Sequence, residues 1–317
     1  MKECRVEISV IIVNYNTCVI TLDCLESLYR KTTGLSFETI LVDNASTDNS
    51  ACAISEKYPQ VRLIALEENI GFARANNLAA QQASGEYLLL LNPDTVVINN
   101  AIEKLLAFAQ GNKQAGICGG RTIFSDSSLN PTSCFGQMTP WSLFCRAIGL
   151  TAVFENFTMF NPECFGSWQY DSVRKVDIVT GCFMLIKASL WEELGGFDPI
   201  FFMYGEEVDF CLRAKKLGYS PMFTPEAEII HHGGASEFDQ VSRWEKVFQA
   251  KSTLMRLHWS RKHFWFGLRM LLMWVATRAV IMSILGTLAP KRFGFKKEKW
   301  AGLWRRRKEW QLGLLTP

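Results

Sequence analysis

The sequence predicts an α/β protein with a mostly parallel central sheet, helices on both faces of the sheet, and a helical, basic C-terminal appendage. Two observations support this prediction. In the first 120 residues, short apolar runs alternate with segments of helical periodicity, the pattern of consecutive βαβ units. The charge then changes sign near residue 240. With 317 residues, of which 48% are hydrophobic, the chain can bury a large core and still carry an appendage.

Four strands are expected in the first hundred residues, the first and fourth of them buried, because each run is short, apolar and bounded by turn-forming residues. The fourth is the clearest: four consecutive leucines lie between Gly85 and Pro93. Helices with leucine at helical spacing separate the strands, which implies right-handed crossovers and a parallel sheet. The expected strands are Ile8–Val13, Phe37–Val42, Val61–Leu66 and Leu88–Leu91.

Polar clusters follow three of these strands: Asn14-Tyr15-Asn16, Asp43-Asn44 and Asn92-Pro93-Asp94. The carboxyl ends of parallel strands meet at one edge of a sheet, where ligands of open α/β folds bind. Three polar ends at that edge imply a shared ligand. Asp43 could accept the imide N–H of uracil or thymine while Tyr15 covers the ring.

Asp94 has two possible roles. A carboxylate at a strand end is a hard oxygen ligand for a divalent cation, and such a cation usually binds substrate phosphates as well. Alternatively, Asp94 caps the helix that starts near Asn99-Asn100.

After Gly120 the regular pattern weakens. Residues 125–175 are rich in Ser, Asn, Pro and Phe and include an apolar piece, Trp141–Leu150. A segment this long inside a compact domain indicates a functional lid or an acceptor-binding region. Regular structure is expected again from Val176 to Leu185.

Two further clusters could carry chemistry. Glu206-Glu207 opens a probable helix, and either carboxylate could act as a general base with a pKa raised by burial and by its neighbour. The alternative is an acidic helix start favoured by the helix dipole. His231 ends another apolar strand and is either a second metal ligand or a hydrogen-bonded structural histidine.

Several classes of protein are disfavoured. No G-x-G-x-x-G follows the first strand and no Walker lysine motif is present, which argues against dinucleotide oxidoreductases and P-loop enzymes. The ten cysteines include no C-x-x-C pair, which argues against a zinc site or disulfide framework and suits a reducing cytosol. The apolar run Ile8–Val13 is too short for a signal peptide.

The C-terminal region carries a strong positive charge. Residues 241–317 hold 17 Lys and Arg against 3 Asp and Glu, whereas residues 1–240 hold 17 against 28. Residues 264–288 are apolar, but Arg269 and Arg278 leave uncharged stretches shorter than the roughly 20 residues of a spanning helix. Basic residues with interleaved Trp300 and Trp304 suit an anionic membrane surface, with nucleic acid or a solvated helix face as the alternatives.

Taken together, these motifs resemble the family-2 glycosyltransferases of GT-A fold, and among them the rhamnosyltransferase-like branch. The motifs follow the family's order over about three-quarters of the chain. They are Val13-Asn14-Tyr15-Asn16, Val42-Asp43-Asn44-Ala45-Ser46, Asn69-Ile70-Gly71-Phe72-Ala73 with Asn77, Asn92-Pro93-Asp94, Thr180-Gly181 with Met184, Gly195-Gly196-Phe197-Asp198, Gly205-Glu206-Glu207-Val208-Asp209 with Arg213, and His231 with Gly234 and Ser236.

The resemblance implies a nucleotide-sugar donor, Mg²⁺ or Mn²⁺, and inversion at the anomeric carbon. Asn92 replaces the first aspartate of the family's D-x-D motif, so Asp94 should carry most of the metal binding, with His231. Glu207 stands where the family has its aspartate base, with Glu206 beside it. The implied acceptor-binding residues are Thr180 and Gly181; the implied donor-binding residues are Asn14, Tyr15, Asp43, Gly71, Arg74, Asn77, Asn92 and Asp94.

The sequence therefore predicts a GT-A catalytic domain over residues 1–238 and a membrane-associating region over 239–317. The predicted reaction moves a sugar, best guessed as L-rhamnose from dTDP-rhamnose, to a lipid-linked saccharide in cell-surface polysaccharide synthesis. The reaction would occur at the cytoplasmic face of the inner membrane. The donor would be a dTDP- or UDP-sugar, and no nucleic-acid partner is expected. One alternative is a weakly active homologue that binds a membrane or partner. The other is a processive polysaccharide synthase, because Gln240–Trp244 matches Q-x-x-R-W.

Overall fold

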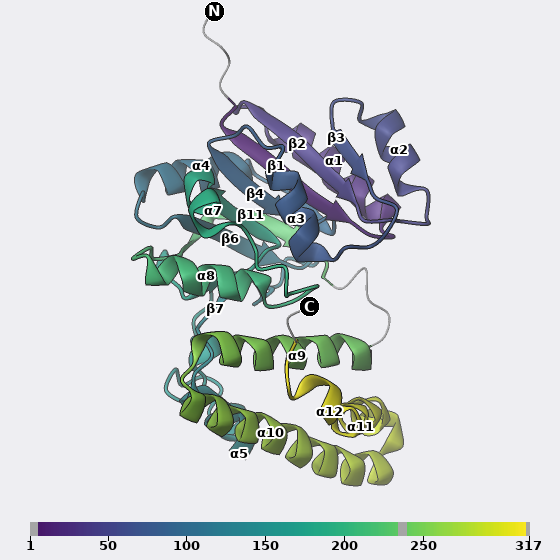
Figure 1. Cartoon of the computed structure of the whole chain (residues 1–317), viewed down its shortest axis with the longest axis vertical. Helices are drawn as coiled ribbons and strands as arrows, with labels where there is room; N and C mark the ends of the chain where they lie inside the picture. The colour runs from purple at the N-terminus through teal and green to yellow at the C-terminus, as the bar shows by residue number, and fades with distance from the viewer. Residues whose placement is uncertain (1–5, 234–239, 315–317) are drawn as a thin grey trace, which may run out of the picture. The chain divides into compact units, whose positions relative to one another are not determined.

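The computed structural model describes residues 6–233 and 240–314, and divides the chain into two compact units. The first unit comprises residues 1–135 and 169–236, and the second comprises 136–168 and 237–317 (Figure 1). The predicted boundary at 238/239 lies outside the described residues. The prediction placed residues 136–168 with the catalytic domain, whereas the structure packs them with the C-terminal helices.

A nine-stranded sheet forms the centre of the first unit, in the order β3-β2-β1-β4-β10-β6-β11-β5 with β8 beside β11. A two-stranded sheet pairs β7 with β9. The strands are β1 (Ile8–Asn14), β2 (Phe37–Asp43), β3 (Arg62–Ala65), β4 (Tyr87–Leu91), β5 (Thr95–Val97), β6 (Ile117–Ile123), β7 (Cys134–Phe135), β8 (Arg174–Lys175), β9 (Ile178–Val179), β10 (Phe183–Lys187) and β11 (Met222–His231).

The four predicted strands form the parallel half of the sheet. β1 pairs in parallel with β2 and with β4, and β2 pairs in parallel with β3. The register sets Asn14 directly beside Asp43, so two of the predicted polar strand ends are neighbours. All residues of β1 and β4 are buried, as expected for strands covered on both faces.

The other half of the sheet is mixed, which the sequence did not predict. β10 runs antiparallel between β4 and β6, and β11 is parallel to β6 but antiparallel to β5. The β5–β11 pairing places His231 opposite Thr95, the residue after Asp94. This pairing brings the last strand of the unit to the polar end of β4.

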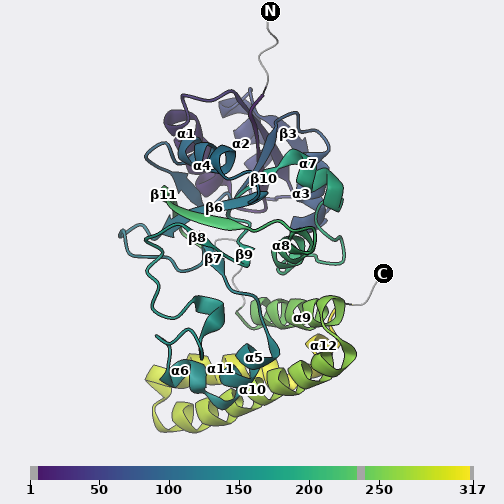
Figure 2. The same cartoon turned by 90° about the vertical axis from the view of Figure 1, so that its left-hand side faces the viewer.

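Helices cover both faces of the large sheet (Figure 2). Leu25 and Ile54 of the first two helices share one apolar core with Ile102 of α4 and with the strands, while α3, α7 and α8 lie on the opposite side. These helices are α1 (Cys18–Lys31), α2 (Ser50–Lys57), α3 (Phe72–Ala80), α4 (Ala101–Gly111), α7 (Ala188–Leu194) and α8 (Glu206–Lys216).

The second unit is helical and has its own core. Phe248, Leu271 and Trp310 are fully buried in that core, and Trp244 packs at its margin. Trp244, the last residue of the Q-x-x-R-W match, therefore serves packing in this unit. The helical segments are α5 (Pro140–Ile148), α6 (Leu150–Val153), η1 (Pro162–Cys164), α9 (Gln240–His258), α10 (Arg261–Leu288), α11 (Pro290–Arg305) and α12 (Arg307–Trp310).

A buried ion cluster joins the two chain segments of the second unit. Glu163 accepts a hydrogen bond from Arg146 at 3.1 Å and lies 3.8 Å from the ammonium group of Lys251 on α9. Arg146 also lies over the Trp274 ring of α10, 5.4 Å from its centre. The two cations together hold the pKa of Glu163 below its ordinary value, although burial alone would raise it.

α10 corrects one expectation from the sequence. Its 28 residues reach a mean hydropathy of 1.8 over an 18-residue window, so Arg269 and Arg278 do not make it too short or too polar to cross a membrane. This result rests on length and composition alone.

Candidate active site

Asn14 and Asp43 form a closed hydrogen-bond network at the ends of β1 and β2. The Asn14 amide donates to Asp43 Oδ1 at 2.5 Å and to Ser46 Oγ at 3.0 Å. Its carbonyl oxygen accepts from Thr17 at 2.6 Å and Thr21 at 2.8 Å. Asn14 is fully buried, so its side chain holds the strand ends in place rather than facing a ligand directly.

Ser46, Thr17 and Thr21 were not singled out from the sequence. The two threonines lie four residues apart at the start of α1, a spacing that places both on one helix face and could have indicated them. Tyr15, next to the network, keeps 38% of its surface exposed and can still cover a nucleotide base.

Asp94 and His231 form the second cluster at this edge. Asp94 Oδ1 lies 3.3 Å from His231 Nε2, and both side chains are about nine-tenths buried. His231 holds the pKa of Asp94 below its ordinary value despite burial. Burial opposes protonation of His231, but the Cys182 thiol and the Asp94 carboxylate favour it and raise the pKa of His231 to about 10.

The position of Asp94 excludes its alternative role. Asn100 occupies the N-cap of α4, and Asp94 pairs with His231 instead. His232, next to His231, is exposed and lies 3.0 Å from Ser125 Oγ through Nδ1. The residue predicted as a ligand is therefore the one that meets Asp94.

The Asp94–His231 pair fits a divalent cation. A carboxylate oxygen and an imidazole nitrogen 3.3 Å apart can occupy one coordination shell, and His231 Nδ1 is buried without a hydrogen-bond partner among the described residues. In the same part of the chain, no group of three or more His, Cys, Asp or Glu side chains is placed to hold a metal. Two protein ligands suit Mg²⁺ or Mn²⁺ whose coordination is completed by phosphate and water.

Glu206 and Glu207 stand at the start of α8, and each keeps one buried carboxylate oxygen, Oε2, without a hydrogen-bond partner in the described residues. Burial raises the pKa of Glu206 well above its ordinary value, and repulsion from Glu207 adds to the rise. Burial also raises the pKa of Glu207, against the opposing effect of backbone N–H groups at the helix start. Both shifts increase the affinity of these carboxylates for a proton, as a general base requires.

The acidic helix start and the general base are therefore not exclusive. The first turn of α8 carries Glu206, Glu207 and Asp209, as the helix dipole favours. Of these three carboxylates, Asp209 forms the ion pair: Arg213 donates a hydrogen bond to it at 2.6 Å. Arg213 also donates to the carbonyl oxygens of Leu194 and Gly196. Asp209 and Arg213 thus anchor α8 and leave the two glutamates for chemistry.

Asn77 connects α3 to the segment that leads into α8. Its amide donates to the Phe197 carbonyl at 2.8 Å, and its oxygen accepts from the Phe197 N–H at 2.9 Å. Both polar atoms of the side chain are used, so the structure gives Asn77 a positioning role; direct donor binding stays a prediction.

Gly71 makes a second link between these segments. It has φ +85, and a Cβ there would lie 2.5 Å from the carbonyl oxygen of Phe202, which accepts a hydrogen bond from Phe72 N. Only glycine allows this approach without strain. The start of α3 and the loop before Glu206 are therefore neighbours at the carboxyl edge of the sheet.

The remaining predicted residues are less constrained. Arg74 is exposed on α3 and Asn92 is half-buried, so both can reach a ligand. Thr180 donates to the Ser133 carbonyl at 3.0 Å, and Gly181 approaches the Phe72 ring. The roles of these four residues stay predictions, and Gly234 and Ser236 lie outside the described residues.

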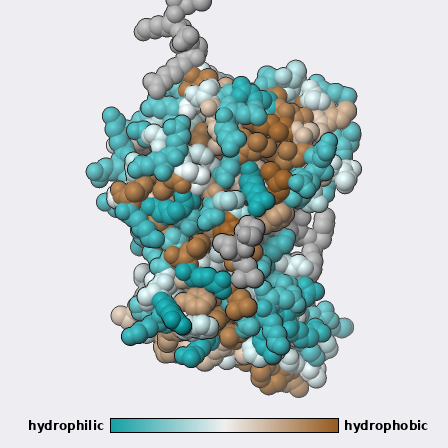
Figure 3. All heavy atoms as spheres, in the orientation of Figure 1, coloured by the Kyte–Doolittle hydropathy of each residue, from teal (hydrophilic) through white to brown (hydrophobic). Residues whose placement is uncertain are grey.

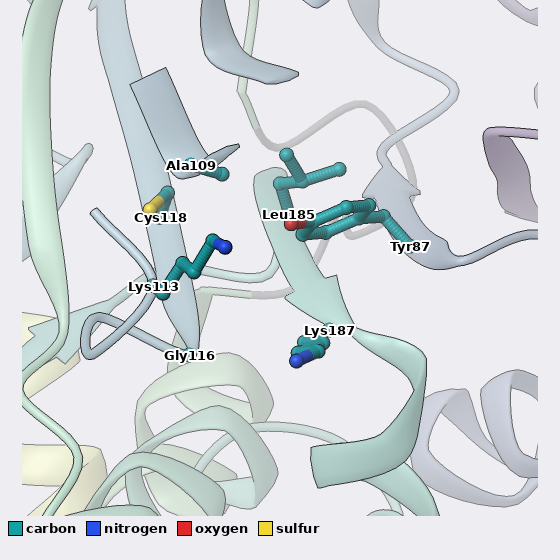
Figure 4. A pocket seen from close by; sticks show the side chains of 7 residues that line it. All are labelled: Tyr87, Ala109, Lys113, Gly116, Cys118, Leu185 and Lys187. Atoms are coloured by element: carbon teal, nitrogen blue, oxygen red, sulfur yellow. The ribbon is translucent and has the colours of Figure 1, made fainter. Parts of the chain in front are cut away.

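A small pocket elsewhere in the sheet is not part of this site (Figure 4). Tyr87, Lys113 and Lys187 line it, and Tyr87 is the first residue of β4. The pocket therefore lies at the opposite end of β4 from Asn92 and Asp94.

The sheet order is that of a GT-A fold, which two solved structures share. The match to the family described as "Glycosyl transferase family 2" covers residues 9–193. The chain belongs to this family, as its motifs indicated.

Its relatives include enzymes of polysaccharide assembly. The chain is 32% identical over 207 residues to N-acetylglucosaminyl-diphospho-decaprenol L-rhamnosyltransferase of Mycobacterium tuberculosis, covering 61% of this chain and 66% of that protein. It is 26% identical over 189 residues to the rhamnosyltransferase WbbL of Escherichia coli, covering 55% and 66%. The matches span just under two thirds of either relative.

Solved structures confirm the predicted fold. The mannosyltransferase PcManGT from Pyrobaculum calidifontis, in complex with GDP-Man and Mn²⁺, superposes with a TM-score of 0.58 at 17% identity over 94% of this chain and 85% of that one. GalNAc-T7 with UDP, GalNAc and Mn²⁺ also gives 0.58, at 15% identity over 82% and 49%.

Proposed function

We propose that this glycosyltransferase inverts the anomeric carbon of its donor, and that it moves L-rhamnose from dTDP-rhamnose to a lipid-linked saccharide. The observation that carries the proposal is the pair of buried glutamates at the start of α8, whose Oε2 atoms have no hydrogen-bond partner among the described residues. The sheet edge that gathers Asp43, Asp94 and His231 supports it. The printed activity of the mycobacterial relative supports the choice of sugar and acceptor.

Each residue has a defined part in the proposed reaction. Asp43 accepts the imide N–H of the base while Tyr15 covers the ring. Asp94 and, once it has lost its second ring proton, His231 would hold the divalent cation, which when bound supplies positive charge opposite the leaving diphosphate. Asn77 and Gly71 keep the loop before α8 against the start of α3.

Glu207 completes the reaction as the general base. It removes the proton of the acceptor hydroxyl, whose oxygen attacks the anomeric carbon from the face opposite the nucleotide. Burial raises the pKa of Glu207, which strengthens it as a proton acceptor. Glu206 lies buried beside the base, and burial together with repulsion from Glu207 raises its pKa and favours its protonated form.

We further propose that the protein works at the cytoplasmic face of the inner membrane, held there by its basic C-terminal helices, without nucleic acid. A lipid-linked acceptor requires the site to reach a membrane surface. Anionic lipid attracts each nearby Lys or Arg by about 1 kcal/mol.

The decisive experiment incubates the purified chain with Mn²⁺ or Mg²⁺, a panel of nucleotide sugars and a lipid-linked acceptor, and identifies products by mass spectrometry. We expect a single rhamnose transfer from dTDP-rhamnose, lost on chelation of the metal. Preference for another donor would refute the rhamnose assignment. Absence of both transfer and donor hydrolysis would favour the weakly active binding module, and repeated addition would favour a processive synthase.

A further inference from the structure

The segment between α5 and η1 exposes an unusual number of large apolar side chains. Val153 is 73% exposed, Phe157 62% and Met159 68%, and Ile148 at the end of α5 is 49% exposed. We call these four residues the apolar tip. Such a concentration of exposed apolar groups marks an interaction surface rather than ordinary solvent contact.

The apolar tip is held in shape by its own contacts. Trp141 Nε1 donates to the Met159 carbonyl at 2.7 Å, and Thr151 donates to the Phe160 carbonyl at 2.8 Å. The rings of Phe154 and Phe160 are 5.0 Å apart. These contacts fix the backbone and leave the apolar tip pointing outward, so exposure is a built property of the segment.

α10 of the same unit presents a matching apolar face. Val280, Ile284 and Leu288 are 61%, 57% and 77% exposed and follow one another at helical spacing. α5, which leads into the apolar tip, packs against α10. Figure 3 shows hydrophobic side chains gathered at the end of the unit where α10 turns into α11.

Positive charge borders this apolar surface. Lys291 and Arg292 lie three and four residues after Leu288 and are exposed, as is Lys296 one turn further along α11. Apolar side chains beside cations are complementary to an anionic lipid surface, where the cations meet headgroups and the apolar groups enter the acyl boundary.

We infer that the apolar tip and the exposed face of α10 together insert into the interface of an anionic bilayer. This inference extends the membrane association proposed above, because it adds a segment from the middle of the chain, residues 148–159, to the basic C-terminal helices. The ligand is the bilayer itself, and α10 lies in its plane.

The packing of α11 along α10 argues for an in-plane helix. Gly286 lies against Lys297, and the rings of Trp274 and Trp300 are 5.8 Å apart, so α11 runs back beside α10. If α10 crossed the bilayer, the lysines of α11 would enter the hydrocarbon with it. Charged side chains at that depth are strongly unfavourable, which excludes a spanning α10 in this packing.

A second copy of the chain suits this surface less well. Two copies meeting through the apolar tip and α10 would bring together two borders of like charge, since residues 241–317 carry 17 Lys and Arg against 3 Asp and Glu. An anionic surface turns the same charges into attraction.

The test measures binding of the full chain to vesicles of phosphatidylcholine with and without phosphatidylglycerol, by flotation. The test variant is Val153→Asp/Phe157→Asp, and the matched control is Val173→Asp, which changes a 52% exposed valine of the first unit. Both variants alter exposed side chains, and thermal unfolding checks that they fold. We expect the test variant to bind anionic vesicles at least about tenfold more weakly, and the control to bind like the unchanged protein.

Salt separates the two parts of the surface. Lys291→Glu/Arg292→Glu should remove binding that high salt weakens, whereas Val153→Asp/Phe157→Asp should remove binding that survives high salt. Equal binding by the apolar-tip variant and the unchanged protein would overturn the inference. So would a dimer in solution that this variant disrupts, with no vesicle binding. Donor hydrolysis, measured separately, tells failure of this inference from failure of the proposed reaction.

Discussion

Two regions of the first unit differ in whether their buried polar groups have hydrogen-bond partners. At the ends of β1 and β2, the amide of Asn14 meets four hydrogen-bond partners. At the start of α8, Glu206 and Glu207 each keep a buried oxygen without one in the described residues. A satisfied network stabilises a shape, whereas an unsatisfied carboxylate keeps its affinity for a proton. The comparison separates residues that build the site from residues that react in it.

The largest expected effect tests the reactive region. Glu207→Gln keeps the volume of the side chain but cannot accept a proton, so kcat should fall by roughly 10²–10⁴ with donor affinity nearly unchanged. The measurement is steady-state kinetics with separate donor binding. Glu206→Gln is the matched variant and should lower kcat less. Small and equal losses at both positions would mean that the pair serves only the helix start.

Mutations in the Asn14 network should lower stability rather than catalysis. Asn14→Ala removes a buried amide that has four hydrogen-bond partners and should reduce the free energy of unfolding by about 3 kcal/mol, measured by denaturant titration. Tyr15→Ala, one residue away but exposed, should leave stability nearly unchanged and weaken donor binding instead. Reversed outcomes at these neighbours would contradict the division into building and reacting residues.

The Asp94–His231 pair is intermediate between the satisfied Asn14 network and the unsatisfied glutamates. The two side chains contact each other in this structure, but would contact the metal instead when it binds. Asp94→Ala and His231→Ala should each weaken Mn²⁺ binding at least roughly tenfold to a hundredfold, measured by calorimetry in the presence of nucleotide. His232→Ala is the control and should leave Mn²⁺ affinity unchanged. A greater loss of Mn²⁺ affinity in His232→Ala than in His231→Ala would mean that His232, not His231, is the metal ligand.

The smallest effect concerns pH and stability. Because the pKa of Glu206 is raised in the folded state, the folded chain binds more protons than the unfolded chain above the ordinary pKa of a glutamate. Stability is therefore lost as pH rises toward the folded pKa. Glu206→Gln removes this loss and should raise the melting temperature by roughly a few degrees near pH 8, but not near pH 4. A difference independent of pH would show that Glu206 does not titrate in this range.

Features encoded locally could be predicted from the sequence. Each of the first four strands is a compact apolar run with turn residues at its borders, and Glu206 directly starts the helix that it was expected to start. The ordered motifs also indicated that Asp94 and His231 meet, although 137 positions separate them.

Features that depend on distant pairing could not be predicted in this way. The antiparallel β10 is as apolar as the parallel strands β1 and β4, so nothing in its composition gives its direction. Asn77 matched the expected donor residues, yet its two hydrogen bonds go to Phe197, 120 positions later. The sequence assigned residues 136–168 to the catalytic domain because they lie between its other segments. Their contact partners, such as Lys251, belong to the C-terminal helices.

This last arrangement has a consequence for synthesis on the ribosome. The segment 136–168 is synthesised well before α9 and α10. Glu163 and Arg146 therefore cannot contact Lys251 and Trp274 until residues 169–236 and the C-terminal helices have been made. During that interval its buried apolar residues, Leu143 among them, have no core to join. A nascent chain stalled before residue 240 should therefore be a substrate for chaperones that bind exposed apolar segments, and release from them should coincide with the appearance of α10.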